Sequence, residues 1–180
     1  TNSVSGELLI GASTIPGAYI LPGFAASFKN RYPDISFQIH ISDSATIIKR
    51  VVNNELYLGV VGAKISNGKV VFTPFGKDKL VLAASPEYAI DDEISADDLY
   101  ELEFLLREQG SGTRKSIEDI LTKLDVNSNR LKIRATLGSS TAIKEAIKSS
   151  LGVSIVSRVA IQDELEFGLL KEIKIKGMEM

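Results

Sequence analysis

Residues 7–42, ELLIGASTIPGAYILPGFAASFKNRYPDISFQIHIS, contain the pattern that decides the fold. An apolar strand is expected at residues 7–12, and a helix is expected at residues 20–32 because apolar side chains recur there at helical spacing. Residues 35–42 then alternate apolar and polar side chains, which is typical of a half-buried strand. This stretch therefore predicts a β-α-β unit. The apolar residues of its helix are Leu21, Phe24, Phe28 and Tyr32.

The same order of elements continues and then returns further along the chain. Periodicity predicts helices from Ser44 and at residues 140–150, and strands at residues 58–63, 104–107, 131–136 and 153–157. A further helix is expected between residues 107 and 131, with Ile117, Ile120, Leu121 and Leu124 on one side. The chain is thus predicted to be an α/β protein with two β-α-β-α-β lobes, at roughly residues 7–64 and 103–157.

Three local signals complete the expected outline. An apolar stretch at residues 80–84 is predicted to open the second lobe as a strand. Ser95 and Asp98 match a capping box before a short helix. Gly152 is the predicted stop of the helix at residues 140–150, since glycine commonly ends helices.

The composition excludes several kinds of chemistry. The 180 residues include no Cys, which excludes disulfides, thiolate metal sites and cysteine nucleophiles, and the single histidine, His40, argues against a His-rich metal site or a Ser-His-Asp triad. The formal net charge of -2 provides no overall basic footprint for nucleic acid. No apolar run approaches the roughly 18 residues of a membrane span. We therefore expect a cytoplasmic domain with no metal, no cofactor, no catalytic residues and no membrane contact.

Hydroxyl-bearing and glycine residues gather where the predicted strands pass into helices. Such junctions lie beyond the carboxyl ends of the strands, where α/β proteins bind ligands, and helix N-termini there bind anions. Two lobes joined by a strand-like connection would form a ligand cleft. Serine and threonine are also preferred helix N-caps whatever the function, so the pattern alone leaves both interpretations open. The junctions are residues 11–14, 42–46, 110–114 and 138–141.

Charged residues flank one of these junctions. An arginine at position 107 or 114 could pair with a ligand carboxylate, or Glu108 could pair with an arginine and shape the loop. We favour the second interpretation, because such pairs commonly serve structure alone. A phosphate-binding P-loop is not supported, since Arg114 stands where that motif needs the glycine before its lysine.

Several segments together resemble the effector-binding domain of LysR-type transcriptional regulators. They are SGELLIGAS at residues 5–13, FKNRYP at 28–33, LGVVG at 58–62, REQGSGTR at 107–114 and AIKSSLGVSIVS at 146–157. The resemblance covers nearly the whole chain. It implies a periplasmic-binding-protein-like (type 2) α/β fold with mixed sheets, in which a small anionic metabolite binds in a cleft between regulatory lobe I (residues 1–77) and regulatory lobe II (residues 78–180).

The resemblance also implies partners and ligand contacts. The regulator would be a homodimer or tetramer that binds promoter DNA through an N-terminal winged helix-turn-helix, which these residues do not contain. Lobe I would be incomplete, because the family sends a last strand and helix back to it. The implied ligand-binding residues are Ser13, Thr14, Gly62, Ala63, Ser111, Gly112, Thr113, Ser139 and Ser140.

Two other classes share this lobe arrangement. The first is the solute-binding protein of a transporter, which would be exported. The second is an enzyme on the same scaffold, which would need a cysteine-anchored cofactor or a Thr-Arg-Phe motif. The sequence has no cysteine, and Thr113-Arg114 is followed by Lys115, so the regulator is preferred.

Overall fold

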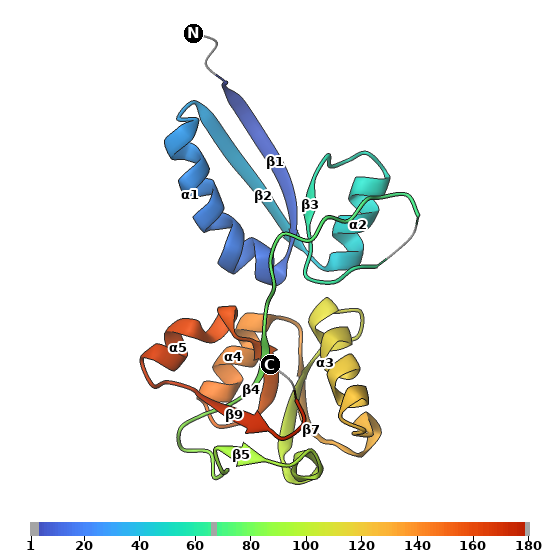
Figure 1. The fold of residues 1–180 in the computed structure, drawn as a ribbon, viewed down its shortest axis with the longest axis vertical. Helices are drawn as coiled ribbons and strands as arrows, with labels where there is room; N and C mark the ends of the chain where they lie inside the picture. The colour runs from blue at the N-terminus through green and yellow to red at the C-terminus, as the bar shows by residue number, and fades with distance from the viewer. Residues whose placement is uncertain (1–3, 66–67, 179–180) are drawn as a thin grey trace. The chain divides into compact units, whose positions relative to one another are not determined.

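A computed structural model describes residues 4–65 and 68–178 of the chain. The chain divides into two compact units, Thr1–Phe75 and Gly76–Met180 (Figure 1). Each unit contains its own parallel strands and its own helices, so each builds a separate set of strand-to-helix junctions.

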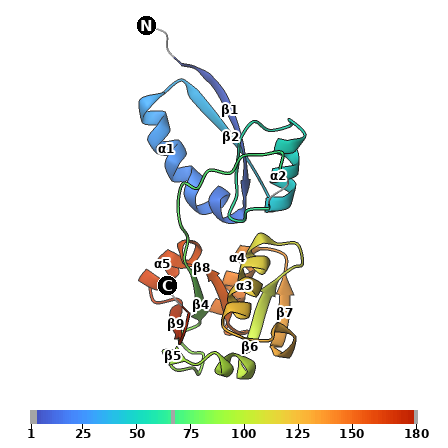
Figure 2. The same cartoon turned by 45° about the vertical axis from the view of Figure 1, so that its right-hand side comes forward.

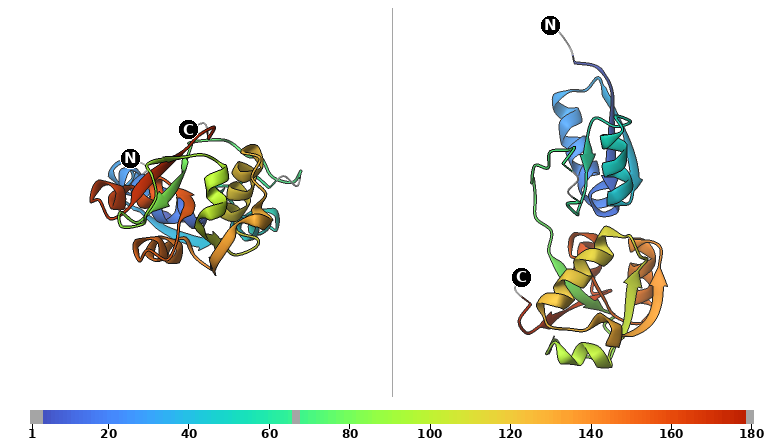
Figure 3. Two further views of the ribbon diagram at one scale, coloured as in Figure 1. Left: turned by 90° about the horizontal axis from the view of Figure 1, so that it is seen from below. Right: turned by 90° about the vertical axis from the view of Figure 1, so that its right-hand side faces the viewer.

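The first unit is a three-stranded sheet in the order β2-β1-β3, with all its strands parallel. The expected mixed sheet is found in the second unit. Helices α1 and α2 flank the strands (Figures 1 and 3). A turn of π-helix at Pro16–Ile20 leads directly into α1, so helical structure begins earlier than predicted. The elements are β1 (Gly6–Ser13), α1 (Leu21–Arg31), β2 (Ile35–Ser42), α2 (Ser44–Val52) and β3 (Gly59–Val60).

Two glycines allow α2 to pack closely on this sheet. A Cβ atom at Gly59 would lie 2.8 Å from Cγ2 of Ile47, and one at Gly11 would lie 3.2 Å from the same atom. Ile47 is completely buried as a result. Because side chains alternate along a strand, the neighbouring Ala12 faces the other side, toward the π-helical turn at Gly17.

Two sequence predictions for the first unit are corrected. The strand expected at residues 58–63 is only the two-residue β3, since the chain leaves the sheet after two pairings with β1, and Leu58, which lies just before β3, is 49% exposed. The apolar side of α1 is also not a core face throughout. Leu21 is buried, but Phe24 is 59% exposed, and Phe28 is 40% exposed although its ring contacts Phe37 of β2.

The second unit contains a four-stranded mixed sheet and a parallel pair (Figure 2). In the order β5-β9-β4-β8, β4 is antiparallel to both of its neighbours. The pair β6-β7 joins this sheet through residue 153: its N–H donates to the Glu103 carbonyl, and its carbonyl accepts from Leu105 N–H, both at 2.8 Å. The strands are β4 (Leu80–Ala84), β5 (Glu93–Ile94), β6 (Glu103–Arg107), β7 (Lys132–Leu137), β8 (Ser154–Ser157) and β9 (Lys171–Ile175).

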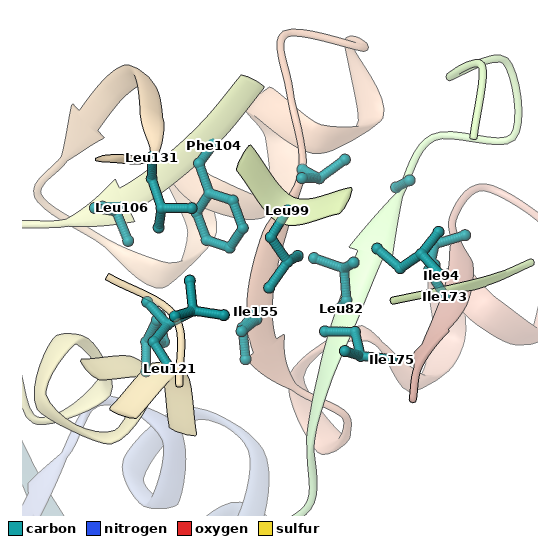
Figure 4. Close-up of a cluster of buried hydrophobic side chains, with 14 residues drawn as sticks. Leu82, Ile94, Leu99, Phe104, Leu106, Leu121, Leu131, Ile155, Ile173 and Ile175 are labelled. Atoms are coloured by element: carbon teal, nitrogen blue, oxygen red, sulfur yellow. The ribbon is translucent and has the colours of Figure 1, made fainter. Parts of the chain in front are cut away.

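Apolar residues of β6 alternate between two cores, one on each face. Phe104 and Leu106 belong to the cluster drawn in Figure 4, which α3 helps to cover, and Leu105 packs with residues of α4. The short helix predicted after Ser95 is present as a 3-10 helix, and the Ser95 N–H donates to Asp98 Oδ2 at 2.7 Å. The α-helices are α3 (Gly112–Lys123), α4 (Ser140–Lys148) and α5 (Gln162–Glu166).

Gly152 has a different role from the predicted one. The residue in left-handed conformation after α4 is Ser150, with φ of 57°. Gly152 is buried, and a Cβ there would fall on the carbonyl oxygen of Glu103 and lie 3.3 Å from Cγ of Leu105. Glycine is therefore needed at this position because β6 passes so close to the start of β8.

Candidate functional site

In the first unit, Ser13 connects the end of β1 to the segment after β3. Ser13 pairs in register with Ser42 at the carboxyl ends of β1 and β2. Its side chain is buried, and the N–H of Gly62 donates to Ser13 Oγ at 2.9 Å. The fold thus brings Ser13 and Gly62, separated by 49 residues, into direct contact at the edge where parallel-strand proteins bind ligands.

The remaining predicted residues of this unit lie beside that contact in the chain. Thr14 begins the helical segment that follows β1, and it is half-buried. Ala63 follows Gly62 and is also half-buried. A Cβ at Gly62 would have only Ser13 Oγ nearby, at 3.8 Å, so open space surrounds this glycine. We call Ser13, Thr14, Gly62 and Ala63 the first donor group.

The junction at residues 42–46 differs from the others, because the chain supplies its own anion there. Asp43 caps α2 and accepts hydrogen bonds from Thr46 N at 2.8 Å and from Thr46 Oγ1 at 2.6 Å. Partial burial acts to raise the pKa of the Asp43 carboxyl, but these hydrogen bonds outweigh it and the pKa lies below its ordinary value. A carboxylate that remains charged disfavours a ligand anion at this helix end.

In the second unit, two helix N-termini leave the same edge of the sheet. Arg107 and Leu137, the last residues of β6 and β7, are partners in the parallel register. The loops that follow lead to α3 and α4, which begin with side-chain caps. Ser111 Oγ accepts from Arg114 N at 3.4 Å, and Ser139 Oγ accepts from Ala142 N at 3.0 Å. Both serines therefore act as the N-caps that their positions indicate.

Gly112 and Thr113 form the first turn of α3, and Ser140 is the first residue of α4. All three are half-buried. Together with Ser111 and Ser139 they form what we call the second donor group.

A buried arginine links the two loops of this group. Arg107 is only 6% exposed, and its Nε and Nη2 atoms both donate to the Glu108 carboxylate at 2.8 Å. Its third nitrogen, Nη1, donates to Ser140 Oγ at 2.7 Å. Arg114 instead pairs with Glu118 at 2.6 Å and donates to the Arg107 carbonyl. The preferred interpretation, in which Glu108 pairs with an arginine, is thus what the structure shows.

Sequence reasoning missed the contact between Arg107 and Ser140, which are 33 residues apart. The signal available was a charged residue at the end of an otherwise apolar, buried strand, since a buried charge needs partners.

The described residues supply hydroxyl and amide donors but no cluster of metal ligands. Within residues 4–65 and 68–178, no group of three or more His, Cys, Asp or Glu side chains is placed to hold a metal ion. Among the helices that the structure describes, none has the length and apolar character required to span a membrane. Both donor groups can donate hydrogen bonds to acceptor atoms.

Two α/β units with hydrogen-bond donors at the carboxyl ends of their parallel strands define a ligand-binding domain with the type 2 periplasmic-binding-protein-like fold. The chain belongs to the LysR substrate binding domain family, whose profile matches residues 1–180.

Two relatives have the same name. The chain is 35% identical over 178 residues to a probable RuBisCO transcriptional regulator of Guillardia theta, covering 96% of this chain and 57% of that protein. It is 34% identical over 182 residues to a protein of the same name from Chlorokybus atmophyticus, covering 98% of this chain and 58% of that protein. The chain thus spans a little over half the length of these relatives.

Solved structures show the same fold. The regulatory domain of CcmR from Synechocystis PCC6803, in complex with 2-PG, is 27% identical with a TM-score of 0.81, covering 96% of this chain and 82% of that one. The effector binding domain of QuiR, in complex with shikimate, is 19% identical with a TM-score of 0.83, covering 98% and 84%.

Proposed function

We propose that this chain is the effector-sensing domain of a LysR-type transcriptional regulator and binds a small anionic metabolite through its two donor groups. The observation that carries the proposal is the chemistry of the strand ends: buried or half-buried hydroxyls and helix-start amides lie at the carboxyl edge of the parallel strands in each unit. Such donors stabilise carboxylate, sulfate or phosphate groups.

The comparisons support a small-molecule ligand. The 27% identical CcmR domain was solved with 2-PG, so 2-PG is the first probe to test here. The proposed ligand-binding residues are the members of the two donor groups, and on this proposal the two units correspond to the regulatory lobes expected at residues 1–77 and 78–180.

The wider role is part of the same proposal. The relatives are named as transcriptional regulators and are longer than this chain, so control of transcription, promoter DNA binding and assembly as a homodimer or tetramer would belong to the full-length protein in the cytoplasm. A transporter's solute-binding protein is not favoured, because the matching family and the named relatives are regulators. For the same reason we propose that the chain has no catalytic activity.

Isothermal titration calorimetry with 2-PG, inorganic phosphate, sulfate and a panel of small carboxylates tests the proposal. Saturable binding of one of these anions is expected. Ser13→Ala and Thr14→Ala should each weaken it by about 1–2 kcal/mol for the hydrogen bond removed. Ser36→Ala is the matched control, since Ser36 lies at the opposite end of the same strands and its hydroxyl donates to Gly6 O at 3.4 Å.

The proposal fails if no anion of the panel binds saturably. If an anion binds but both Ser13→Ala and Thr14→Ala leave its affinity unchanged, the first donor group is not the binding site.

A further inference from the structure

The hydrogen bond between Arg107 and Ser140 has only one possible direction. A guanidinium carries five N–H donors and no acceptor, so the Ser140 oxygen must accept from Nη1 across the 2.7 Å separation. A serine hydroxyl has a single hydrogen, and here that hydrogen cannot be used in the bond to Arg107. It is left for another acceptor.

The same constraint applies to Ser13 in the first unit. Its partner is the backbone N–H of Gly62, at 2.9 Å, and a backbone N–H can only donate. Ser13 Oγ is therefore also an acceptor within the protein, with its hydrogen left to donate. Each donor group thus contains one serine whose oxygen already accepts a hydrogen bond from a group that can only donate.

The charge of Arg107 is paired with the Glu108 carboxylate. Nε and Nη2 form a bidentate pair with Glu108, both at 2.8 Å, while Nη1 extends to Ser140. This fork geometry fixes the guanidinium plane, which the single ammonium of a lysine could not do. The arginine side chain is only 7% exposed and each of its three nitrogens already donates to Glu108 or Ser140, so we expect Arg107 to act on a ligand through the Ser140 hydroxyl.

We propose that Arg107, held in place by Glu108, is a positioning residue. By donating to Ser140 Oγ, it leaves the hydroxyl hydrogen of Ser140 to donate to the effector. This inference rests on the proposed function and specifies its ligand class. Acceptor groups such as carboxylate, phosphate or sulfate oxygens fit an oriented hydroxyl hydrogen. A ligand ammonium group fits less well, because it could use only the remaining lone pair of an oxygen that already accepts from a cation.

A double-mutant cycle on the 180-residue chain tests the proposal, with calorimetric titration of 2-PG and inorganic phosphate as probes. Ser140→Ala should weaken binding about tenfold, and Ser140→Thr, which keeps a hydroxyl, should restore most of the affinity. Arg107→Gln should cost a similar factor, since the glutamine oxygen can accept the serine hydrogen and reverse the hydrogen bond. Arg107→Gln added to Ser140→Ala should have no further effect.

Ser149→Ala is the matched control. It removes a serine hydroxyl from the other end of α4, where Oγ donates to the Glu145 carbonyl at 2.9 Å, and it should leave binding unchanged. Thermal melting of each variant shows whether it is folded. If Arg107→Gln does not fold, Glu108→Gln replaces it in the cycle, because it weakens the pair that holds Arg107 and should likewise lose its effect in the Ser140→Ala background.

Two results would overturn this inference and leave the proposed function standing. Additive losses for Arg107→Gln and Ser140→Ala would show that Arg107 does not act through Ser140. Equal affinity of Ser140→Ala and the wild type would show that the hydroxyl does not donate to the ligand. In both cases the wild type still binds and the proposed function stands. A wild type that binds no anion overturns both.

Discussion

Replacing Gly152 by alanine places a methyl group where two strands of the second unit meet. The new Cβ would overlap the carbonyl oxygen of Glu103, lie 3.2 Å from its carbon and 3.3 Å from Leu105 Cγ. That carbonyl accepts the N–H of Val153 at 2.8 Å, and the Val153 carbonyl accepts from Leu105 N–H at 2.8 Å. These two hydrogen bonds attach β6 to the start of β8, so the methyl group forces apart the connection between the parallel pair and the mixed sheet.

The expected cost follows from three contributions. Losing or lengthening two backbone hydrogen bonds removes about 1–3 kcal/mol. Overpacking in a buried site adds about 1–3 kcal/mol. The lower conformational entropy of the unfolded alanine chain offsets about 0.4–1 kcal/mol. Gly152→Ala should therefore lower the free energy of unfolding by about 1–5 kcal/mol, a large part of the roughly 5–15 kcal/mol typical of a folded protein.

Urea unfolding followed by far-ultraviolet circular dichroism measures this change as a shift in midpoint. Gly138→Ala is the matched control, because Gly138 lies in the same unit and a Cβ there has no atom within 4 Å. It should be neutral or slightly stabilising. If the free energy of unfolding of Gly152→Ala lies within about 0.5 kcal/mol of the wild-type value, as it commonly does for surface substitutions, the close approach of β6 to β8 does not require glycine at this position.

Three further predictions concern charge and helix formation. Burial acts to raise the pKa of the Glu164 carboxyl, but the 2.9 Å ion pair and hydrogen bond with Lys144 outweigh it, so the pKa lies below its ordinary value. The stability that this pair provides is present above the unfolded pKa of about 4.5 and is lost as the pH falls through the lower folded pKa. Glu164→Gln should therefore destabilise the protein at pH 7 and make its stability depend less on pH in the acid range. An unaltered dependence of stability on pH would contradict this prediction. Asp43→Ala should lower the free energy of unfolding by about 0.5–2 kcal/mol in thermal or urea unfolding, because it removes the N-cap to which Thr46 donates. Asp43→Asn should retain most of the capping stability, and equal losses for the two variants would argue against capping. Gly23→Ala, at an exposed position within α1 where a Cβ meets no atom within 4 Å, should stabilise the helix by about 0.5–1 kcal/mol in the same measurement, and any loss of stability would contradict that estimate.

The order of strands and helices could be predicted from periodicity alone. β2 matches the predicted strand at residues 35–42, and α2 begins at the predicted Ser44. The start of α4 could be predicted in the same way, because Ser139 caps this helix through a neighbour only three residues away, whereas the first helical segment begins earlier than predicted. These features depend on side-chain spacing and hydrogen bonding within a few residues, so the local sequence contains what determines them.

The extent of burial could not be predicted in the same way. Phe24 and Leu58 continue apolar patterns of their segments, yet both side chains are largely exposed. A periodic pattern shows which residues share a face, but the neighbouring element decides how far that face is covered. In this small sheet, β3 pairs over two residues only.

The sequence by itself determined the alternating α/β architecture, the absence of cysteine chemistry and the positions of the hydroxyl-rich junctions. Tertiary structure alone decided which arginine pairs with Glu108, that Gly152 serves strand packing, and that Ser13 and Ser140 accept hydrogen bonds from Gly62 and Arg107. The reason is range: the first set depends on residues a few positions apart, whereas the second depends on atoms that meet only when strands distant in the chain lie side by side.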